Sequence, residues 1–124
     1  MHIDFHNNTP IYIQLLDYMK TYIISGQINC GDKLPSVREL ALMFNVNPNT
    51  MQKALVELEE EKLIVTERTN GKYVTQDKEI IERLKEEYAR DIISNFYTSM
   101  KKIGIEEKDA YSYLKDYRNG TSKD

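Results

Sequence analysis

The sequence of 124 residues predicts a mostly α-helical fold that contains one small β-hairpin. Apolar residues recur at three- and four-residue steps along most of the chain, which indicates amphipathic helices. The dipeptide Asn70-Gly71 lies between two β-prone runs, and that arrangement is a strong hairpin signal. From Asp77 onward the pattern becomes one long amphipathic helix. We therefore expect an N-terminal domain over residues 1–76 and a helical region over residues 77–124.

Each of the three helices predicted before the hairpin begins at a recognisable start signal. Pro10 is a favourable first-turn residue for the first of them. Ser36 is a strong N-cap for the second, and Glu39 follows three residues later to complete a capping box. Asn47-Pro48 combines a cap with a first-turn proline for the third. The helices are expected over residues 10–25, 36–43 and 48–62.

The predicted hairpin and the two helices after it complete the order of elements. The strands are expected over residues 63–68 and 72–75, and Gly104 is expected to end the long helix over residues 77–103. A final, shorter helix is expected over residues 105–117. Three helices followed by a hairpin make a winged helix-turn-helix, in which the third helix enters the major groove of DNA.

The start of the third helix carries the kinds of side chain that DNA recognition requires. Amide, hydroxyl and ammonium groups in its first turns are suited to hydrogen bonds with base edges or phosphates. These residues are Asn47, Asn49, Thr50, Gln52 and Lys53. The acids of this helix begin only at Glu57, so a helix inserted by its N-terminus would bring its positive dipole end to the phosphates. The alternative is an ordinary polar helix face with good capping.

Three other basic residues are candidates for contacts that position the protein on DNA. Arg38 lies two residues after the predicted cap of the second helix, where this topology crosses the DNA backbone. Arg68 and Lys72 flank the hairpin tip and could reach the adjacent minor groove. The alternatives are a surface ion pair of Arg38 with Glu39 or Glu57, and solvated wing charges without a partner.

The charge balance favours local rather than global attraction to DNA. The chain has 17 Lys and Arg residues against 20 Asp and Glu residues, a net charge of −3, whereas a typical DNA-binding domain is basic. Affinity for DNA must therefore come from where the charges lie, which favours a site-specific, dimeric binder. The acidic total also leaves open a module that docks another protein and never contacts DNA.

Catalysis, metal binding and membrane insertion find little support in the sequence. His2, Asp4 and His6 would share one side of an extended segment, but two histidines and one carboxylate rarely hold a metal without a fourth ligand. The single Cys30 has no candidate base nearby, and no glycine-rich phosphate loop exists. No apolar run could span a bilayer and no signal peptide is visible, so we expect a cytoplasmic protein without a cofactor or membrane partner.

Three segments of the chain resemble one family of proteins. They are Pro10-Ile11-Tyr12-x-Gln14, Gly31-Asp32-Lys33-Leu34-Pro35-Ser36-Val37-Arg38-Glu39-Leu40-Ala41 and Val46-Asn47-Pro48-Asn49-Thr50. They are similar to the GntR family of bacterial regulators, and the two-helix C-terminal part resembles its YtrA subfamily. The resemblance implies a winged domain that binds operator DNA, an appendage that dimerises, and repression of transporter genes. It also implies DNA contacts at Ser36, Arg38, Asn47, Asn49, Thr50, Lys53 and the wing tip around Gly71.

Two features qualify this resemblance. The family's wing usually reads Gly-x-Gly, and Thr69 replaces its first glycine, which puts the minor-groove contact in question. GntR-type heads also occur fused to aminotransferase-like domains, but this chain has no lysine-bearing cofactor domain. We therefore expect a sequence-specific transcriptional regulator rather than an enzyme.

The long helix over residues 77–103 predicts a homodimer. Its apolar stripe cannot be buried against the short final helix alone, so we expect it to pack against the same helix of a second subunit. The expected interface residues are Ile81, Leu84, Tyr88, Ile92, Phe96, Met100, Tyr113 and Tyr117. Two-fold symmetry in turn predicts a near-palindromic operator. A small-molecule effector of unknown identity would need a pocket shared across the dimer or between the domains.

Overall fold

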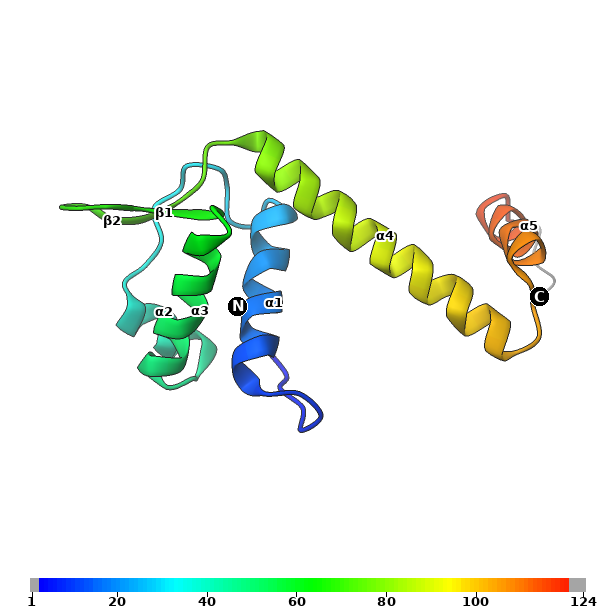
Figure 1. Ribbon diagram of the computed structural model, residues 1–124, viewed down its shortest axis with the longest axis horizontal. Helices are drawn as coiled ribbons and strands as arrows, with labels where there is room; N and C mark the ends of the chain where they lie inside the picture. The colour runs from blue at the N-terminus through cyan, green and yellow to red at the C-terminus, as the bar shows by residue number, and fades with distance from the viewer. Residues whose placement is uncertain (1–2, 121–124) are drawn as a thin grey trace. The chain divides into compact units, whose positions relative to one another are not determined.

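The computed structural model describes residues 3–120, in which the chain forms five helices and one two-stranded antiparallel hairpin (Figure 1). In chain order the elements are α1 (Ile11–Ile24), α2 (Val37–Phe44), α3 (Pro48–Glu60), β1 (Ile64–Glu67), β2 (Gly71–Val74), α4 (Lys78–Lys102) and α5 (Glu107–Arg118). The predicted mostly helical fold with a small hairpin is therefore confirmed. No helix in this part of the chain combines the length and the apolar character needed to cross a membrane.

Helices α1 and α3 lie side by side at the centre of the N-terminal part, and α2 also packs against α3 (Figure 1). Their buried side chains recur at helical spacing, as expected for one face of an amphipathic helix. On α1 and α3 they include Leu15, Met19, Ile23, Met51, Leu55 and Leu58. Burial of each such side chain stabilises the fold by about 1.5–3 kcal/mol. The packing of this inner face determines which side of α3 is left to the solvent.

One side-chain cap defines the start of α2, and a left-handed residue and a second cap form the connection from α2 to α3. The predicted capping box is present, because Ser36 Oγ accepts from Glu39 N at 3.2 Å and Ser36 N donates to Glu39 Oε1 at 3.0 Å. Asn45 ends α2 with a φ of 55°, a conformation that asparagine adopts more readily than most residues. Asn47 then caps α3, since its Oδ1 accepts from Asn49 N at 2.7 Å.

The hairpin extends past the helices on the left of Figure 1 and forms the wing. Its strands pair in antiparallel register with Glu67 opposite Gly71, and Gly71 has a φ of +102°, which glycine tolerates without steric cost. A third extended segment, which the sequence did not predict, pairs with β2 through a single bridge between Lys33 and Tyr73. One bridged residue is too short to produce an alternating pattern, which explains why sequence periodicity missed it.

The chain divides into two compact units between Leu84 and Lys85, inside α4. Ile81 and Leu84, in the first turns of α4, are each only 9% exposed and belong to the N-terminal unit. The domain boundary expected after residue 76 stays a prediction, and that position lies between the end of β2 and the start of α4. Among the described residues of the C-terminal unit, Ala110 is the one buried hydrophobic residue. Its large exposed apolar side chains are Ile92, Ile93, Ile103, Tyr111, Tyr113, Leu114 and Tyr117.

Candidate nucleic-acid interface

The first turns of α3 present polar side chains to the solvent. Asn49, Gln52 and Lys53 are exposed and Thr50 is half-buried, whereas Met51 on the inner face is completely buried. The cap residue of this helix is exposed as well. The free amides at the start of α3 and these side chains are therefore accessible to an external partner. That combination suits phosphate oxygens and base edges.

The start of α2, which packs against α3, carries a further exposed guanidinium. Arg38 and Ser36 are both exposed. The backbone and hydroxyl groups of Ser36 hold the pKa of the Glu39 carboxyl below its usual range, because hydrogen bonds stabilise the charged carboxylate. Among the described residues, neither Glu39 nor Glu57 forms an ion pair with Arg38. The Arg38 guanidinium therefore stays available for an anion such as a phosphate.

Lys53 and Glu57 of α3 both interact with one aromatic residue of α1. The Lys53 ammonium lies over the Tyr12 ring, 4.3 Å from the ring centroid. The Tyr12 hydroxyl donates a hydrogen bond to Glu57 Oε1. This hydrogen bond, followed by burial and the nearby carboxylates, raises the pKa of the Tyr12 phenol. The side-by-side packing of α1 and α3 brings these three residues together.

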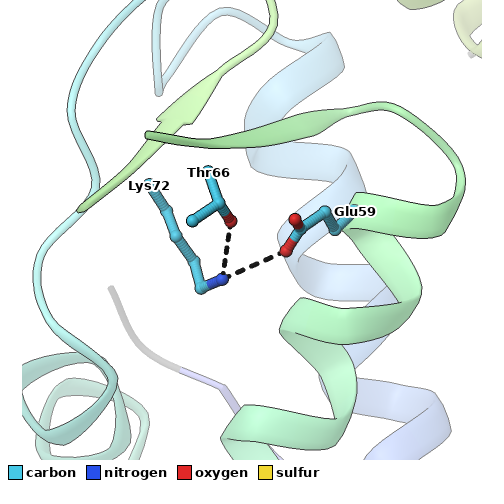
Figure 2. A network of polar contacts seen from close by, with 3 residues as sticks. All are labelled: Glu59, Thr66 and Lys72. Atoms are coloured by element: carbon cyan, nitrogen blue, oxygen red, sulfur yellow. Dashed lines mark hydrogen bonds and ion pairs between the residues drawn. The ribbon is translucent and has the colours of Figure 1, made fainter. Parts of the chain in front are cut away.

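Lys72 in the wing is paired within the protein, as Figure 2 shows. Its Nζ donates to Glu59 Oε1 at 3.1 Å and to Thr66 Oγ1 at 2.9 Å. The ammonium of Lys72, with Thr66 adding a smaller effect, holds the pKa of the Glu59 carboxyl below its usual range. This contact ties the wing to the end of α3. Lys72 would have to leave Glu59 in order to reach a DNA groove, whereas Arg68 at the hairpin tip is exposed.

A hollow of about 660 Å³ between the start of α2 and the wing gathers several of the predicted site residues. Its lining includes Ser36, Gly71 and Lys72, which the sequence had placed in separate elements. Lys33 also lines it, and a Cβ added at Gly71 would lie 3.5 Å from Lys33 Cε. The structure does not bring Arg68 into this lining.

Two residues that lie next to the predicted site residues, Lys33 and Tyr12, were not predicted from the sequence as site residues. Lys33 is positioned by its single bridge to Tyr73, and no sequence pattern indicates that bridge. Tyr12 belongs to a motif that resembles the family, but no local sequence pattern indicates that its ring lies under Lys53. Both positions depend on contacts between segments that are distant in sequence. Among the sequence signals, only the resemblance to the GntR family covers Tyr12 and Lys33.

The described residues contain no assembled metal site of the kind considered from the sequence. His2 lies outside them, and among residues 3–120 no group of three His, Cys, Asp or Glu residues could hold a metal ion. His6 is involved in local structure, because its backbone N–H donates to Gln14 Oε1 at 3.0 Å and its Nδ1 accepts from Asn8 N at 3.2 Å. Cys30 is a free, exposed thiol.

The sequence also matches a known family of proteins. Residues 11–74 fit the profile described as bacterial regulatory proteins of the gntR family. The chain belongs to the GntR family. The GntR match covers the three helices and the wing, which are the elements that carry the surface described above. A full-length relative is the HTH-type transcriptional repressor YtrA from Bacillus subtilis (strain 168), which is 38% identical over 92% of this chain and 88% of that protein.

Solved structures agree with this GntR assignment. A GntR family transcriptional regulator from Listeria monocytogenes is 44% identical with a TM-score of 0.81, over 90% of this chain and 98% of that one. AraR(DBD) in complex with operator ORX1 is 25% identical with a TM-score of 0.54, over 60% of this chain and 95% of that one. The GntR chain described here is thus a DNA-binding transcriptional regulator of the winged helix-turn-helix type, and it is not an enzyme.

Proposed function

We propose that this GntR-family chain represses transcription as a homodimer, by inserting the start of α3 from each subunit into a near-palindromic operator. The observation that carries this proposal is the arrangement of α3. Asn49, Gln52 and Lys53 are exposed around its amide end, while the acids lie in its later turns. A relative over most of the chain is a transcriptional repressor, which supports repression rather than activation.

Each of these side chains has a role that its chemistry suits. Asn49 and Gln52 can read adenine through paired hydrogen bonds, and Lys53 can bind guanine or a phosphate. Arg38 and the Ser36 hydroxyl at the start of α2 would hold the DNA backbone and fix the register of α3. In the wing, we assign the minor-groove contact to Arg68 and the backbone at Gly71, because Lys72 is paired with Glu59.

The C-terminal unit supports the homodimer because it has little core of its own. Ile92 is 66% exposed and Tyr117 is 78% exposed, and apolar surfaces of this kind mark interaction sites. We centre the interface on α4 and α5, at Tyr88, Ile92, Phe96, Met100, Tyr113 and Tyr117. Ile81 and Leu84 would contribute less, since they are already buried in the protomer. A two-fold dimer would then bind two operator half-sites about one turn of the DNA helix apart.

Control of transporter genes, which the resemblance to YtrA-type regulators implies, belongs to the same proposal.

The decisive experiment is selection of binding sites from a pool of randomised DNA duplexes. We expect repeated binding to the full-length protein to enrich one sequence with dyad symmetry. Gel shifts with the selected duplex should then show an affinity that falls with salt, because Lys and Arg displace counterions from phosphates. An unselected duplex of equal length is the control. If no sequence is enriched, site-specific DNA binding is refuted and docking of a protein partner becomes the better explanation.

A further inference from the structure

Tyr12 lies between two opposite charges of α3 that would otherwise face each other. Lys53 and Glu57 are four residues apart in one helix, a spacing at which opposite charges attract across one turn. Within the described residues, however, no ion pair joins them. The Lys53 ammonium instead lies 4.3 Å from the centroid of the Tyr12 ring, and Glu57 accepts the hydrogen bond of the Tyr12 hydroxyl.

We propose that Tyr12 is a positioning residue of the DNA interface, which keeps the charge of Lys53 available by holding Glu57 away from it. The inference rests on the proposed function, because it requires Lys53 to contact DNA. The two halves of Tyr12 have different tasks. Its hydroxyl occupies the Glu57 carboxylate, and its ring supports the Lys53 side chain without supplying a negative charge.

The contacts of Tyr12 are strong enough to position the Lys53 side chain in the free protein and weak enough to release its ammonium to DNA. A cation over an aromatic ring at an exposed site is held only weakly, so a phosphate can take the Lys53 ammonium from the ring. A carboxylate paired with Lys53 would compete directly with that phosphate. It would also cancel the counterion release that drives binding to DNA. The raised pKa of the Tyr12 phenol is consistent with a neutral hydroxyl that donates to the Glu57 side chain.

The position of Tyr12 follows from the fold and not from α3 itself. Tyr12 is in the first turn of α1, which packs along α3 through buried residues such as Leu15 and Met51. A residue outside the helix-turn-helix therefore determines the electrostatic state of a side chain inside it.

The test compares Tyr12→Phe, which keeps the ring and removes the hydroxyl, with the wild type on the selected operator duplex. Affinity is measured by fluorescence anisotropy over a salt series, and folding is checked by thermal melting. We expect Tyr12→Phe to bind about three- to tenfold more weakly, a part of the loss that removal of one DNA contact causes. The slope of affinity against salt should also decrease, by at most about 0.9. The matched control is Tyr22→Phe, which removes a hydroxyl from the same helix where the ring packs near Phe44.

The Glu57→Gln background distinguishes this role of Tyr12 from a purely structural one. A structural role would make Tyr12→Phe lose the same affinity with or without the Glu57 carboxylate. If Tyr12 acts by occupying Glu57, the penalty of Tyr12→Phe should disappear in the Glu57→Gln background. An equal penalty in both backgrounds would overturn the proposal, and so would wild-type affinity and salt slope in Tyr12→Phe.

Lys53→Ala distinguishes failure of the Tyr12 role from failure of the proposed contact between Lys53 and DNA. If Lys53→Ala weakens binding and Tyr12→Phe does not, only the role of Tyr12 fails. If Lys53→Ala binds normally, the Lys53 contact is wrong and the Tyr12 proposal falls with it.

Discussion

Two carboxylates in the later turns of α3 and one at its C-cap have partners inside the protein, which leaves fewer unpaired negative charges near the DNA-binding surface of a chain with a net charge of −3. Glu57 accepts from Tyr12, Glu59 pairs with Lys72, and Glu61 pairs with Lys20 at 2.9 Å. Each contact is partly exposed, so each contributes at most about 1 kcal/mol to stability. Their larger effect is on charge, because each carboxylate is engaged by a group of the protein itself.

Arg38 is the residue whose replacement should most directly separate DNA binding from folding. Because its side chain is exposed and has no acidic partner among the described residues, Arg38→Ala should melt like the wild type. Its affinity for the selected operator should fall by about 1–3 kcal/mol in gel shifts. Arg90→Ala is the control, since it removes another exposed guanidinium, which belongs to α4 and lies 3.9 Å from Glu86. Unchanged binding by Arg38→Ala would place the DNA on another face.

Glu59 makes the stability of the wing dependent on pH. Because Lys72 and Thr66 lower its pKa in the folded state, the ion pair stabilises the protein above the ordinary pKa of glutamate. This contribution is lost as the pH falls through the lowered value. In urea titrations the wild type should exceed Glu59→Gln by about 0.5 kcal/mol near neutral pH. The difference should vanish in strong acid. Glu82→Gln, which changes an exposed glutamate in the first turns of α4, is the control. A difference that persisted in acid would exclude the ion pair as its cause.

At the scale of elements, the passage from α3 into the wing contains a residue in an unfavourable conformation. Lys62 follows the end of α3 with a φ of 66°, in the left-handed region where helices commonly end with glycine. Glu61 N and Lys62 N still hydrogen-bond back into the helix, to Glu57 O and Glu59 O. The backbone therefore holds a turn that glycine would adopt at a lower cost.

Lys62→Gly should consequently stabilise the protein. Removing the side chain relieves a cost of about 1–2 kcal/mol, and the greater freedom of glycine in the unfolded chain offsets about 0.5–1 kcal/mol of that gain. We expect the free energy of unfolding to rise by about 0.5–1 kcal/mol in urea titrations. Lys62→Ala keeps a Cβ in the same conformation and should show no comparable gain. Equal effects of the two substitutions would mean that backbone conformation is not the cause.

At the scale of the whole molecule, the two compact units differ in how they bury apolar residues. The N-terminal unit has a continuous core that includes Leu40, Met51 and Val74. In the C-terminal unit, Ile92 and Tyr117 are exposed although both are large and apolar. A second subunit is the partner that we propose for that surface.

Ile92→Asp should therefore convert the dimer into a monomer. A carboxylate at the centre of an apolar interface has no partner there, and its burial is strongly unfavourable. Analytical ultracentrifugation should show half the mass of the wild type. Operator affinity should also drop, because a monomer holds one half-site. Ser94→Asp adds the same charge on a different side of α4 and should remain dimeric. An Ile92→Asp protein that sediments like the wild type would contradict this interface.

Most of the fold could be predicted from local signals along the chain. The helices follow from apolar spacing, the starts of α2 and α3 from Ser36 and Asn47, and the hairpin from Asn70-Gly71. These signals succeed because a cap acts within three residues and a helix repeats within one turn. The exposed residues at the start of α3 could be chosen in the same way, since the buried face of the helix implies the opposite one.

Only the tertiary structure decided the partners of the charged side chains. The sequence by itself determined that Lys53 and Lys72 are candidates, but it contained no sign that one lies over Tyr12 and the other pairs with Glu59. The bridge formed by Lys33 was equally invisible. The physical reason is that these contacts join segments far apart along the chain. They exist because burial of apolar faces packs α1 against α3 and places the wing beside α3. No local pattern of residues encodes contacts between such distant segments.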